Sequence, residues 1–311
     1  MKLPFELESI SITLALLLLL VACALPTLDL PGASNDSIVV FDITQSMNVE
    51  DHEVDGASVD RLTYARSAAR AALHDLPCGS RVGWAVFAEY RTLLLLAPIE
   101  VCAHYNDLLA TLDAIDGRMR WGNASEISKG AFWALRVAQE IGTRPNVVIV
   151  SDGHEAPPLR GAGPAMFDDL ERGLIHGWVI GVGGDIPKPI PRTDADGKRL
   201  GFWRPEEVVQ TGDDPTRSGG EHLSSLREVH LRALAQQIGF DYARLTGAGT
   251  LRAALRDPRF TQRRPVPTDV GWVPAVAALA VLAWTFRPTM RRRRQRAGLG
   301  ANAFRGEVLD E

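Results

Sequence analysis

The chain has 311 residues, of which 46% are hydrophobic and 23% are charged, and its formal net charge is -4. This length has room for one domain of about 200 residues with flanking segments, or for two small domains. The charge balance is that of an ordinary soluble domain and excludes nucleic acid as a general partner, which would require a basic excess.

Two uncharged apolar runs flank the chain, at residues 10–26 and 270–286. Each lies near the lower limit of about 17–25 residues for a spanning helix, and we predict that both cross a membrane. The first run also fits a cleaved signal peptide, and its Leu-Val-Ala-Cys stretch resembles a lipobox with Cys23 acylated. The acidic residues before it argue against both of these alternatives. A buried helix is the alternative for the second run.

Arginines crowd the segment after the second apolar run, at 287, 291–294 and 296. Basic residues beside a membrane helix stay in the cytoplasm, so we predict that 1–9 and the basic tail 287–311 are cytoplasmic. The main domain then lies on the periplasmic side of a bacterial inner membrane. A nucleic-acid patch is the disfavoured alternative for these arginines.

The first elements of the main domain are a strand, a helix and a hairpin. Residues 37–41 form a short apolar run that is typical of a buried central strand. Asp60 precedes a helical pattern with one apolar face. Two β-rich runs, 81–88 and 91–98, are separated by two residues, which predicts an antiparallel hairpin.

The hairpin predicts a disulfide. If the turn centres on Glu89 and Tyr90, the numbers of paired residues sum to about 179. Cys78 and Cys102 sum to about 180, so they fall nearly opposite each other, at a separation that a disulfide can bridge. The periplasm permits disulfides. Two buried free thiols are the alternative.

Helices and strands alternate through the rest of the domain. We expect helices at 104–115, 127–141, 224–238 and 250–256, and strands at 147–151, 174–180 and 241–245. This alternation predicts a doubly wound, mostly parallel α/β sheet with one antiparallel edge strand over residues 36–256. The Pro- and Gly-rich segment 185–220 interrupts the pattern as a hairpin and loop insertion, with a turn at Asp194–Gly197.

Polar clusters follow the predicted strands at the edge where such sheets bind ligands. Asp42, Thr44 and Ser46 alternate in an extended loop, so their side chains point the same way. Ser125 precedes a helix, and Asp152 ends a strand. These oxygen donors suit a hard divalent cation, with Mg²⁺ as first choice and Ca²⁺ or Mn²⁺ as alternatives. The competing interpretation is that they cap helices and turns.

The sequence Asp-Ile-Thr-Gln-Ser-Met at 42–47 resembles the metal-ion-dependent adhesion site (MIDAS) of von Willebrand factor A domains. The resemblance implies that Asp42, Thr44 and Ser46 form the first metal loop, that Ser125 supplies the second-loop hydroxyl and that Asp152 supplies the third-loop acid. The family usually has Ser at the second position and Thr in the second loop, and this chain keeps both hydroxyls. The resemblance also implies that an acidic residue of a partner protein completes the metal shell.

Further stretches resemble the MxaL type of this family, which are envelope accessory proteins of bacterial methanol-oxidation clusters. They lie at 76–83, 91–95, 151–158, 181–184, 201–203 and 221–225. The resemblance implies a role in maturing periplasmic methanol dehydrogenase, with calcium insertion as the task. The wider membrane-anchored bacterial von Willebrand A group shares this architecture, so a general envelope stress or assembly component is the alternative.

Trp121, His154 and Glu155 adjoin the predicted metal loops and are candidate contacts for the partner, although polar or aromatic loop residues are often merely exposed. The acidic run 50–55 offers spare carboxylates for Ca²⁺, but a solvated acidic loop is the favoured interpretation. We find no pairing of a nucleophile with a base, and no Lys or Arg clamp near the three loops in sequence. The sequence therefore predicts no catalytic residues, and a metal-dependent hydrolase is disfavoured.

Overall fold

The computed structural model describes residues 5–25, 28–158, 173–210 and 220–285, and the chain divides into two units. One unit comprises 1–30 with 265–311, and the other comprises 31–264. The predicted cytoplasmic tail 287–311, the first four residues and the end of the first apolar run lie outside the described residues.

The terminal unit contains two helices that coincide with the apolar runs, α1 (Phe5–Ala24) and a helix over 272–285. Among the described residues, no helix is long and apolar enough to cross a membrane. The two predicted spans are therefore unconfirmed. Cys23 lies in α1 as a free cysteine. Strands β1 (Leu28–Ser34) and β14 (Gln262–Thr268) pair in a two-stranded sheet.

A six-stranded sheet forms the centre of the main unit, in the order β13-β8-β7-β2-β5-β6. All neighbours are parallel except β5 and β6, so β6 is an antiparallel edge strand. The predicted doubly wound sheet with one antiparallel edge is confirmed. Its strands are β2 (Asp36–Asp42), β5 (Arg81–Ala88), β6 (Arg91–Glu100), β7 (Asn146–Ser151), β8 (Gly177–Gly181) and β13 (Asp241–Arg244).

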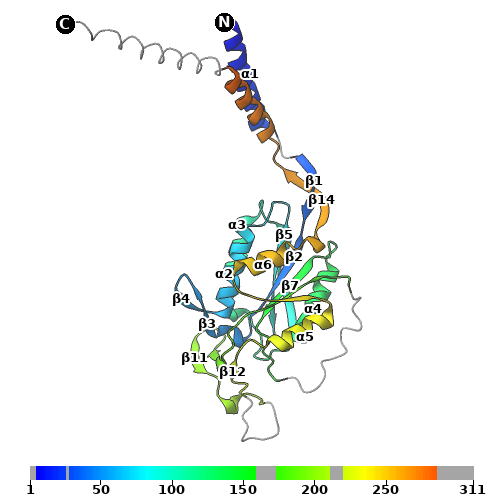
Figure 1. Cartoon of the computed structure of the whole chain (residues 1–311). Coiled ribbons are helices and arrows are strands. Elements are labelled where there is room, and N and C mark those ends of the chain that lie inside the picture. The colour runs from blue at the N-terminus through cyan, green and yellow to red at the C-terminus, as the bar shows by residue number, and fades with distance from the viewer. Residues whose placement is uncertain (1–4, 26–27, 159–172, 211–219, 286–311) are drawn as a thin grey trace, which may run out of the picture. The chain divides into compact units, whose positions relative to one another are not determined.

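Helices cover both faces of this sheet (Figure 1). Val39 and Phe41 of β2 pack into one core with α2, α3 and α6, whereas Ile38 and Val40 pack into a second core with α4 and α5. This alternation makes β2 buried on both sides, as parallel central strands are. The helices are α2 (Arg61–His74), α3 (Tyr105–Ala114), α4 (Ile127–Glu140), α5 (Glu228–Ile238) and α6 (Ala248–Leu255).

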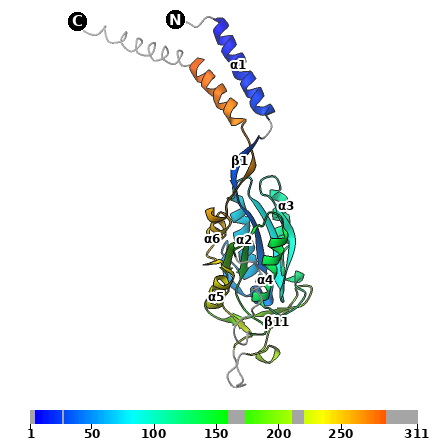
Figure 2. The same cartoon turned by 90° about the vertical axis from the view of Figure 1, so that its right-hand side faces the viewer.

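Small hairpins lie at the end of the domain where β2 and β7 finish (Figures 1 and 2). β3 (Glu50–Val54) pairs with β4 (Ala57–Asp60), where the sequence predicted an acidic loop. In the predicted insertion, β10 (Pro191–Thr193) pairs with β11 (Arg199–Phe202), which confirms the hairpin. β9 (Lys188–Pro189) pairs with β12 (Leu223–Ser224) and closes the base of the insertion. Short 3-10 helices are η1 (Gln45–Asn48), η2 (Gly117–Met119), η4 (Pro205–Glu207) and η5 (Pro258–Phe260).

The starts of two elements differ from the sequence prediction by three or more residues. α5 begins at Glu228 rather than at 224, because Leu223 and Ser224 extend to pair with β9. β8 begins at Gly177 rather than at 174, and a Cβ at Gly177 would lie 1.8 Å from the backbone oxygen of Val147. Close backbone approach of this kind requires glycine, so the strand starts where the chain lies tightest against β7.

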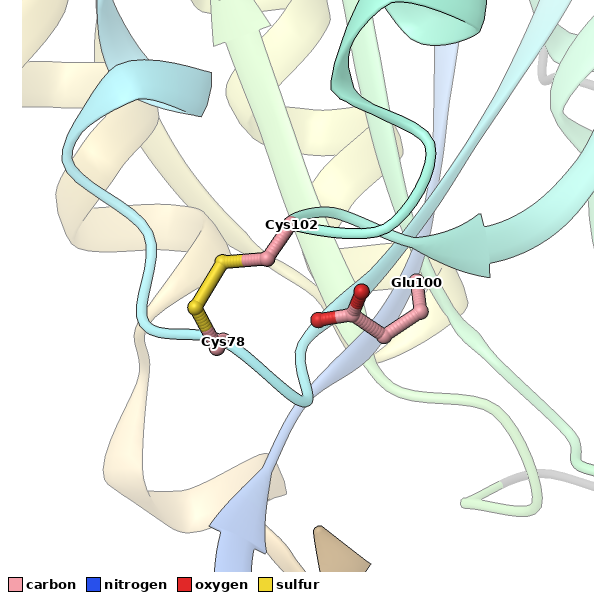
Figure 3. Close-up of side chains that lie close together, drawn as sticks. All are labelled: Cys78, Glu100 and Cys102. Atoms are coloured by element: carbon pink, nitrogen blue, oxygen red, sulfur yellow. A yellow bond between two sulfur atoms is a disulfide. The ribbon is translucent and has the colours of Figure 1, made fainter. Parts of the chain in front are cut away.

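The hairpin register and the disulfide are confirmed. Phe87 pairs with Thr92 and Ala88 with Arg91, as the sequence predicted, and two irregularities shift the register further from the turn. Cys78 and Cys102 form a disulfide with a Cα–Cα distance of 5.2 Å (Figure 3).

The Glu100 carboxylate lies beside this disulfide (Figure 3). The two sulfurs bond to each other, so they are not free to hold a metal. Glu100 itself accepts hydrogen bonds from the backbone N–H groups of Gly79 at 2.6 Å and Ala103 at 2.5 Å. This cluster therefore closes the base of the hairpin.

Candidate metal centre

The first loop of the candidate site follows β2 and begins at the fully buried Asp42. Asp42 Oδ1 accepts hydrogen bonds from the backbone N–H of Thr44 at 2.9 Å and from Thr44 Oγ1 at 2.6 Å. The Oγ atoms of Thr44 and Ser46 lie 3.3 Å apart. The alternating loop therefore places its three oxygen-bearing side chains together, as the sequence predicted.

The third loop follows β7, the parallel neighbour of β2, and carries Asp152. Ser46 Oγ donates to Asp152 Oδ1 at 3.1 Å, which joins the first loop to the third. Ser151 Oγ donates to Asp42 Oδ2 at 2.6 Å. Two hydroxyl groups thus link the first loop to the third, one from each side, and the sequence analysis had not assigned Ser151 to the site.

The second loop carries Ser125, held against the third loop by backbone hydrogen bonds. The Ser125 N–H donates to the oxygen of Ala156 at 2.7 Å, and the Ala156 N–H donates to the oxygen of Ser125 at 2.9 Å. Ser125 Oγ is buried and has no hydrogen-bond partner among the described residues. Buried hydroxyls normally have a partner, and an unpaired one indicates a missing ligand, ion or water.

The charges of this site also favour a cation. Burial, together with the negative charge of Asp152, raises the pKa of Asp42 to about 7, against the smaller effect of its hydroxyl hydrogen bonds. A divalent ion would offset this penalty, because its charge would face both carboxylates. Three hydroxyls and two carboxylates are hard oxygen donors of the kind that Mg²⁺ and Ca²⁺ prefer. The residues present therefore fit the metal that the motif implies.

Arg61, at the start of α2, lies fully buried behind the three loops. Its Nη1 donates to Asp152 Oδ2 at 2.5 Å, and its Nη2 donates to Asp51 Oδ2 at 2.7 Å. Burial alone would lower the pKa of Arg61, but the carboxylates of Asp152 and Asp51 raise it above its ordinary value. The sequence analysis found no Lys or Arg clamp and did not identify Arg61, which the fold brings to a loop 91 residues away in the chain.

Ser224 and Asp51 complete this buried cluster and were also missed. Ser224 Oγ donates to Asp152 Oδ2 at 2.9 Å and accepts from Arg61 Nη1 at 2.7 Å. The Asp51 side chain is only 4% exposed, so the solvated-loop interpretation of the acidic run is wrong for this residue. One signal was present in the sequence. Arg61 is a cation in the first turn of α2, where it opposes the helix dipole, and this indicates that an acidic residue compensates its charge.

The candidate partner contacts fall in two places. His154 and Glu155 are buried and line a cavity at the metal loops, whereas Trp121 is 44% exposed and lines a neighbouring cavity. His154 Nδ1 has no partner among the described residues, and burial lowers the pKa of this imidazole. Glu155 Oε1 lies 3.0 Å from His230 Nε2, within hydrogen-bond distance. This contact lowers the pKa of the Glu155 carboxyl, but the larger effect of burial raises it.

The cavity at the metal loops, hereafter the site cavity, has a volume of about 260 Å³. The residues Thr44, Ser46 and Ser125 line one part of it, whereas the fully buried Asp42 and Asp152 do not line it. Residues from the insertion line another part, and these are Ile190, Trp203, Glu207, Val208, Val209 and Glu221. The insertion thus converts the metal edge of the sheet into a pocket.

A mostly parallel six-stranded sheet with an antiparallel edge carries these three loops at its carboxyl end, which is the fold that the resemblance to von Willebrand A domains implied. No family model matches the chain. It is similar to a UPF0353 protein of Mycobacterium sp. (strain KMS), with 29% identity over 261 residues, which are 76% of this chain and 70% of that protein. A UPF0353 protein of Mycobacterium leprae (strain TN) is 25% identical over 262 residues, covering 75% of this chain and 70% of its own.

Among solved structures, the chain is similar to an aerotolerance-related membrane protein from Bacteroides fragilis, with a TM-score of 0.50 and 18% identity. The match covers 73% of this chain and 98% of that one. This likeness concerns the fold. A von Willebrand factor type A structure from Catenulispora acidiphila also matches, with a TM-score of 0.42 and 13% identity over 74% of this chain and 44% of that one.

Proposed function

We propose that this protein is a metal-dependent protein-binding module, in which Asp42, Thr44, Ser46, Ser125 and Asp152 hold a divalent cation. The observation that carries the proposal is the buried Ser125 hydroxyl, which lacks a partner among the described residues and lines the same cavity as Thr44 and Ser46. A metal would satisfy that hydroxyl and would leave a coordination position open toward the cavity. A carboxylate of a partner would bind at that position.

Binding rather than catalysis is proposed because the three loops gather the hydroxyls and carboxylates that would hold a metal. Arg61 is the cation that contacts the metal acid Asp152, and its guanidinium is already bound to Asp51 and Asp152. It is therefore not free to clamp a transferring phosphoryl group. His154 has a lowered pKa through burial, which keeps it neutral near pH 7 and a poor general acid.

Calorimetric titration of the full chain with Mg²⁺ tests the metal site. We expect one site in the wild type, its loss in Asp42→Asn and weaker binding in Ser125→Ala. Asp194→Asn is the matched control, because this acid only closes the β10–β11 turn by accepting from the N–H groups of Asp196 and Lys198. Circular dichroism monitors folding. Equal Mg²⁺ binding by wild type and Asp42→Asn would overturn the proposal.

We propose further that the domain is anchored in the bacterial inner membrane and faces the periplasm. The support is the pair of apolar runs with arginines after the second, together with the exposure of Leu16, Leu17 and Leu20 in α1. The solved structure from B. fragilis is also described as a membrane protein. We expect the protein to resist extraction by carbonate, and we expect protease added to spheroplasts to digest the domain. Release of the protein by carbonate would contradict the anchoring.

The finer proposal is a role in maturing periplasmic methanol dehydrogenase by calcium insertion or assembly. Its support is the set of MxaL-like stretches described above. A strain lacking the gene should yield methanol dehydrogenase with little bound calcium, measured by atomic emission of the purified enzyme. Normal calcium content would overturn this proposal. If oxygen tolerance fell instead, the alternative role as a general envelope stress component would take its place, in keeping with the aerotolerance-related protein that shares the fold.

A further inference from the structure

The site cavity combines two kinds of surface. The hydroxyl-bearing residues Thr44, Ser46 and Ser125 line one part, and the apolar residues Ile190, Val208 and Val209 line another. Its volume of about 260 Å³ lies below the range of about 300–1,000 Å³ that is usual for small-molecule sites. It therefore has room for one or two side chains of a partner rather than for a broad folded surface.

The apolar wall is fixed to the metal loop by a single side chain. Gln45, between the ligands Thr44 and Ser46, accepts at Oε1 from the backbone N–H of Thr193 at 3.0 Å and from Trp203 Nε1 at 3.1 Å. Its Nε2 donates to Asn123 Oδ1 at 2.7 Å, on the loop that carries Ser125. The insertion and two metal loops are thus held in one arrangement around the cavity.

The base of the insertion is fixed at a second point. Ser224 of β12, which pairs with β9, donates to the metal acid Asp152. The anchors at Gln45 and at Ser224 thus hold the insertion that carries the wall to the metal loops through part-buried and buried hydrogen bonds. Such a wall is preorganised, so a ligand does not have to order it on binding.

The charges of the cavity leave only the metal to hold an anion. None of the described residues that line it is a Lys or an Arg. The acids Glu155 and Glu207 are paired with His230 and Arg192, respectively. A carboxylate that enters this cavity meets no Lys or Arg among the described lining residues. The affinity of the carboxylate must therefore come from the bound metal ion.

We propose that the site cavity selects an acidic residue flanked by a bulky apolar side chain, with the carboxylate on the metal and the apolar side chain against Ile190, Val208 and Val209. This inference rests on the proposed metal-dependent binding and names the class of partner: an extended segment whose sequence places Asp or Glu next to Leu or a similar residue. Val209 is 54% exposed, so an occupied cavity would bury apolar surface that the free protein leaves in water.

Three labelled pentapeptides test the inference by fluorescence anisotropy with the detergent-solubilised full chain and Mg²⁺. They are acetyl-Gly-Leu-Asp-Leu-Gly amide, its Gly-Gly-Asp-Gly-Gly counterpart and its Gly-Leu-Asn-Leu-Gly counterpart. We expect the first to bind at least about tenfold more tightly than the other two. The Gly-Asp-Gly peptide lacks the Leu side chains, of which each buried methylene contributes about fourfold, and the Leu-Asn-Leu peptide lacks the carboxylate that would bind the metal. Detergent without protein corrects for partition into micelles.

Variants locate the apolar contact. Val209→Ser should bring the Leu-Asp-Leu peptide close to the affinity of the Gly-Asp-Gly peptide. Val229→Ser is the matched control, because Val229 is 85% exposed on α5 and does not line the cavity. Both substitutions replace an exposed Val, so neither should unfold the chain, and circular dichroism checks this.

The outcomes separate this inference from the proposed function. If the Leu-Asp-Leu and Gly-Asp-Gly peptides bind equally and both need Mg²⁺, the cavity does not select an apolar side chain, and the proposed metal-dependent function stands. If the Leu-Asn-Leu peptide binds as tightly as Leu-Asp-Leu and EDTA has no effect, both are wrong. If no peptide binds above the detergent background, the inference is overturned. An unchanged affinity in Val209→Ser contradicts the assigned wall.

Discussion

The two ends of the central sheet are stabilised by different chemistry. At the end where β2 and β7 finish, buried acids, hydroxyls and the guanidinium of Arg61 hold the loops together without a covalent bond. At the other end, the Cys78–Cys102 disulfide closes the β5–β6 hairpin. Under the proposed function, the end that would admit an ion and a partner is stabilised by polar contacts, and the end that only joins elements is crosslinked.

The largest expected effect is the loss of Arg61. Arg61→Met leaves Asp51 and Asp152 buried without their cation, and removing one partner of a buried pair costs about 3–5 kcal/mol. Urea denaturation followed by circular dichroism measures the free energy of unfolding. Arg70→Met is the control, since its pair with Asp113 is about half exposed and should contribute under about 1 kcal/mol. Equal losses in the two variants would show that the buried network does not stabilise this end.

The next effect concerns the crosslinked end. Replacing Cys78 and Cys102 by Ser opens a loop of 24 residues and should lower the free energy of unfolding by about 3 kcal/mol. Mg²⁺ affinity should stay within about twofold of the wild type, because the disulfide and the metal loops lie at opposite ends of the sheet. Cys23→Ser, at the free cysteine, is the control for both measurements. A large fall in Mg²⁺ affinity would show that the two ends are coupled.

A smaller effect is expected at the anchor of the insertion. Gln45→Leu leaves the Trp203 and Thr193 N–H groups without their acceptor and should cost about 1–2 kcal/mol. Affinity for the Leu-Asp-Leu peptide should fall, whereas Mg²⁺ affinity should not, because Gln45 contributes no metal ligand. Gln236→Leu, a substitution of the same type at an exposed position of α5 that does not line the cavity, controls for the change in side chain. Loss of Mg²⁺ binding in Gln45→Leu would contradict the separation of wall and metal.

The smallest effect on folding is expected at Ser125. Since its Oγ has no partner among the described residues, Ser125→Ala should leave the free energy of unfolding unchanged to within about 0.5 kcal/mol in the absence of metal. Mg²⁺ affinity should nevertheless fall by about tenfold or more. Thr143→Val, which removes another buried hydroxyl without a described partner, should change neither quantity. A destabilised Ser125→Ala with normal Mg²⁺ affinity would make Ser125 a structural residue.

The sequence predicted those features that depend on local pattern. The apolar runs of β2 and β7, the cap of α2 by Asp60 and the register of the β5–β6 turn all follow from residues close together in the chain. Motif resemblance added Ser125, which no local pattern would have joined to Asp42.

The ionic cluster behind the loops could not be predicted in the same way. Arg61 and Asp152 are 91 residues apart, and Ser224 lies a further 72 residues beyond Asp152. Nothing in the local pattern around Ser224 pairs it with an arginine, and its apolar neighbours suggested a helix that starts four residues too early. Such contacts depend on how the loops converge after the sheet has formed.

The Arg61 cluster also constrains how this protein can change over evolutionary time. The guanidinium of Arg61 pairs with Asp152 and with Asp51 of β3. Ser224, at the base of the insertion, forms hydrogen bonds with both Arg61 and Asp152. If one of these charged residues is lost alone, another charge stays buried in the domain without its partner. Positions 51, 61 and 152 should therefore be inherited as a set across descendants of this sequence, and a lineage that abandons the cation is expected to lose Arg61 and both acids together.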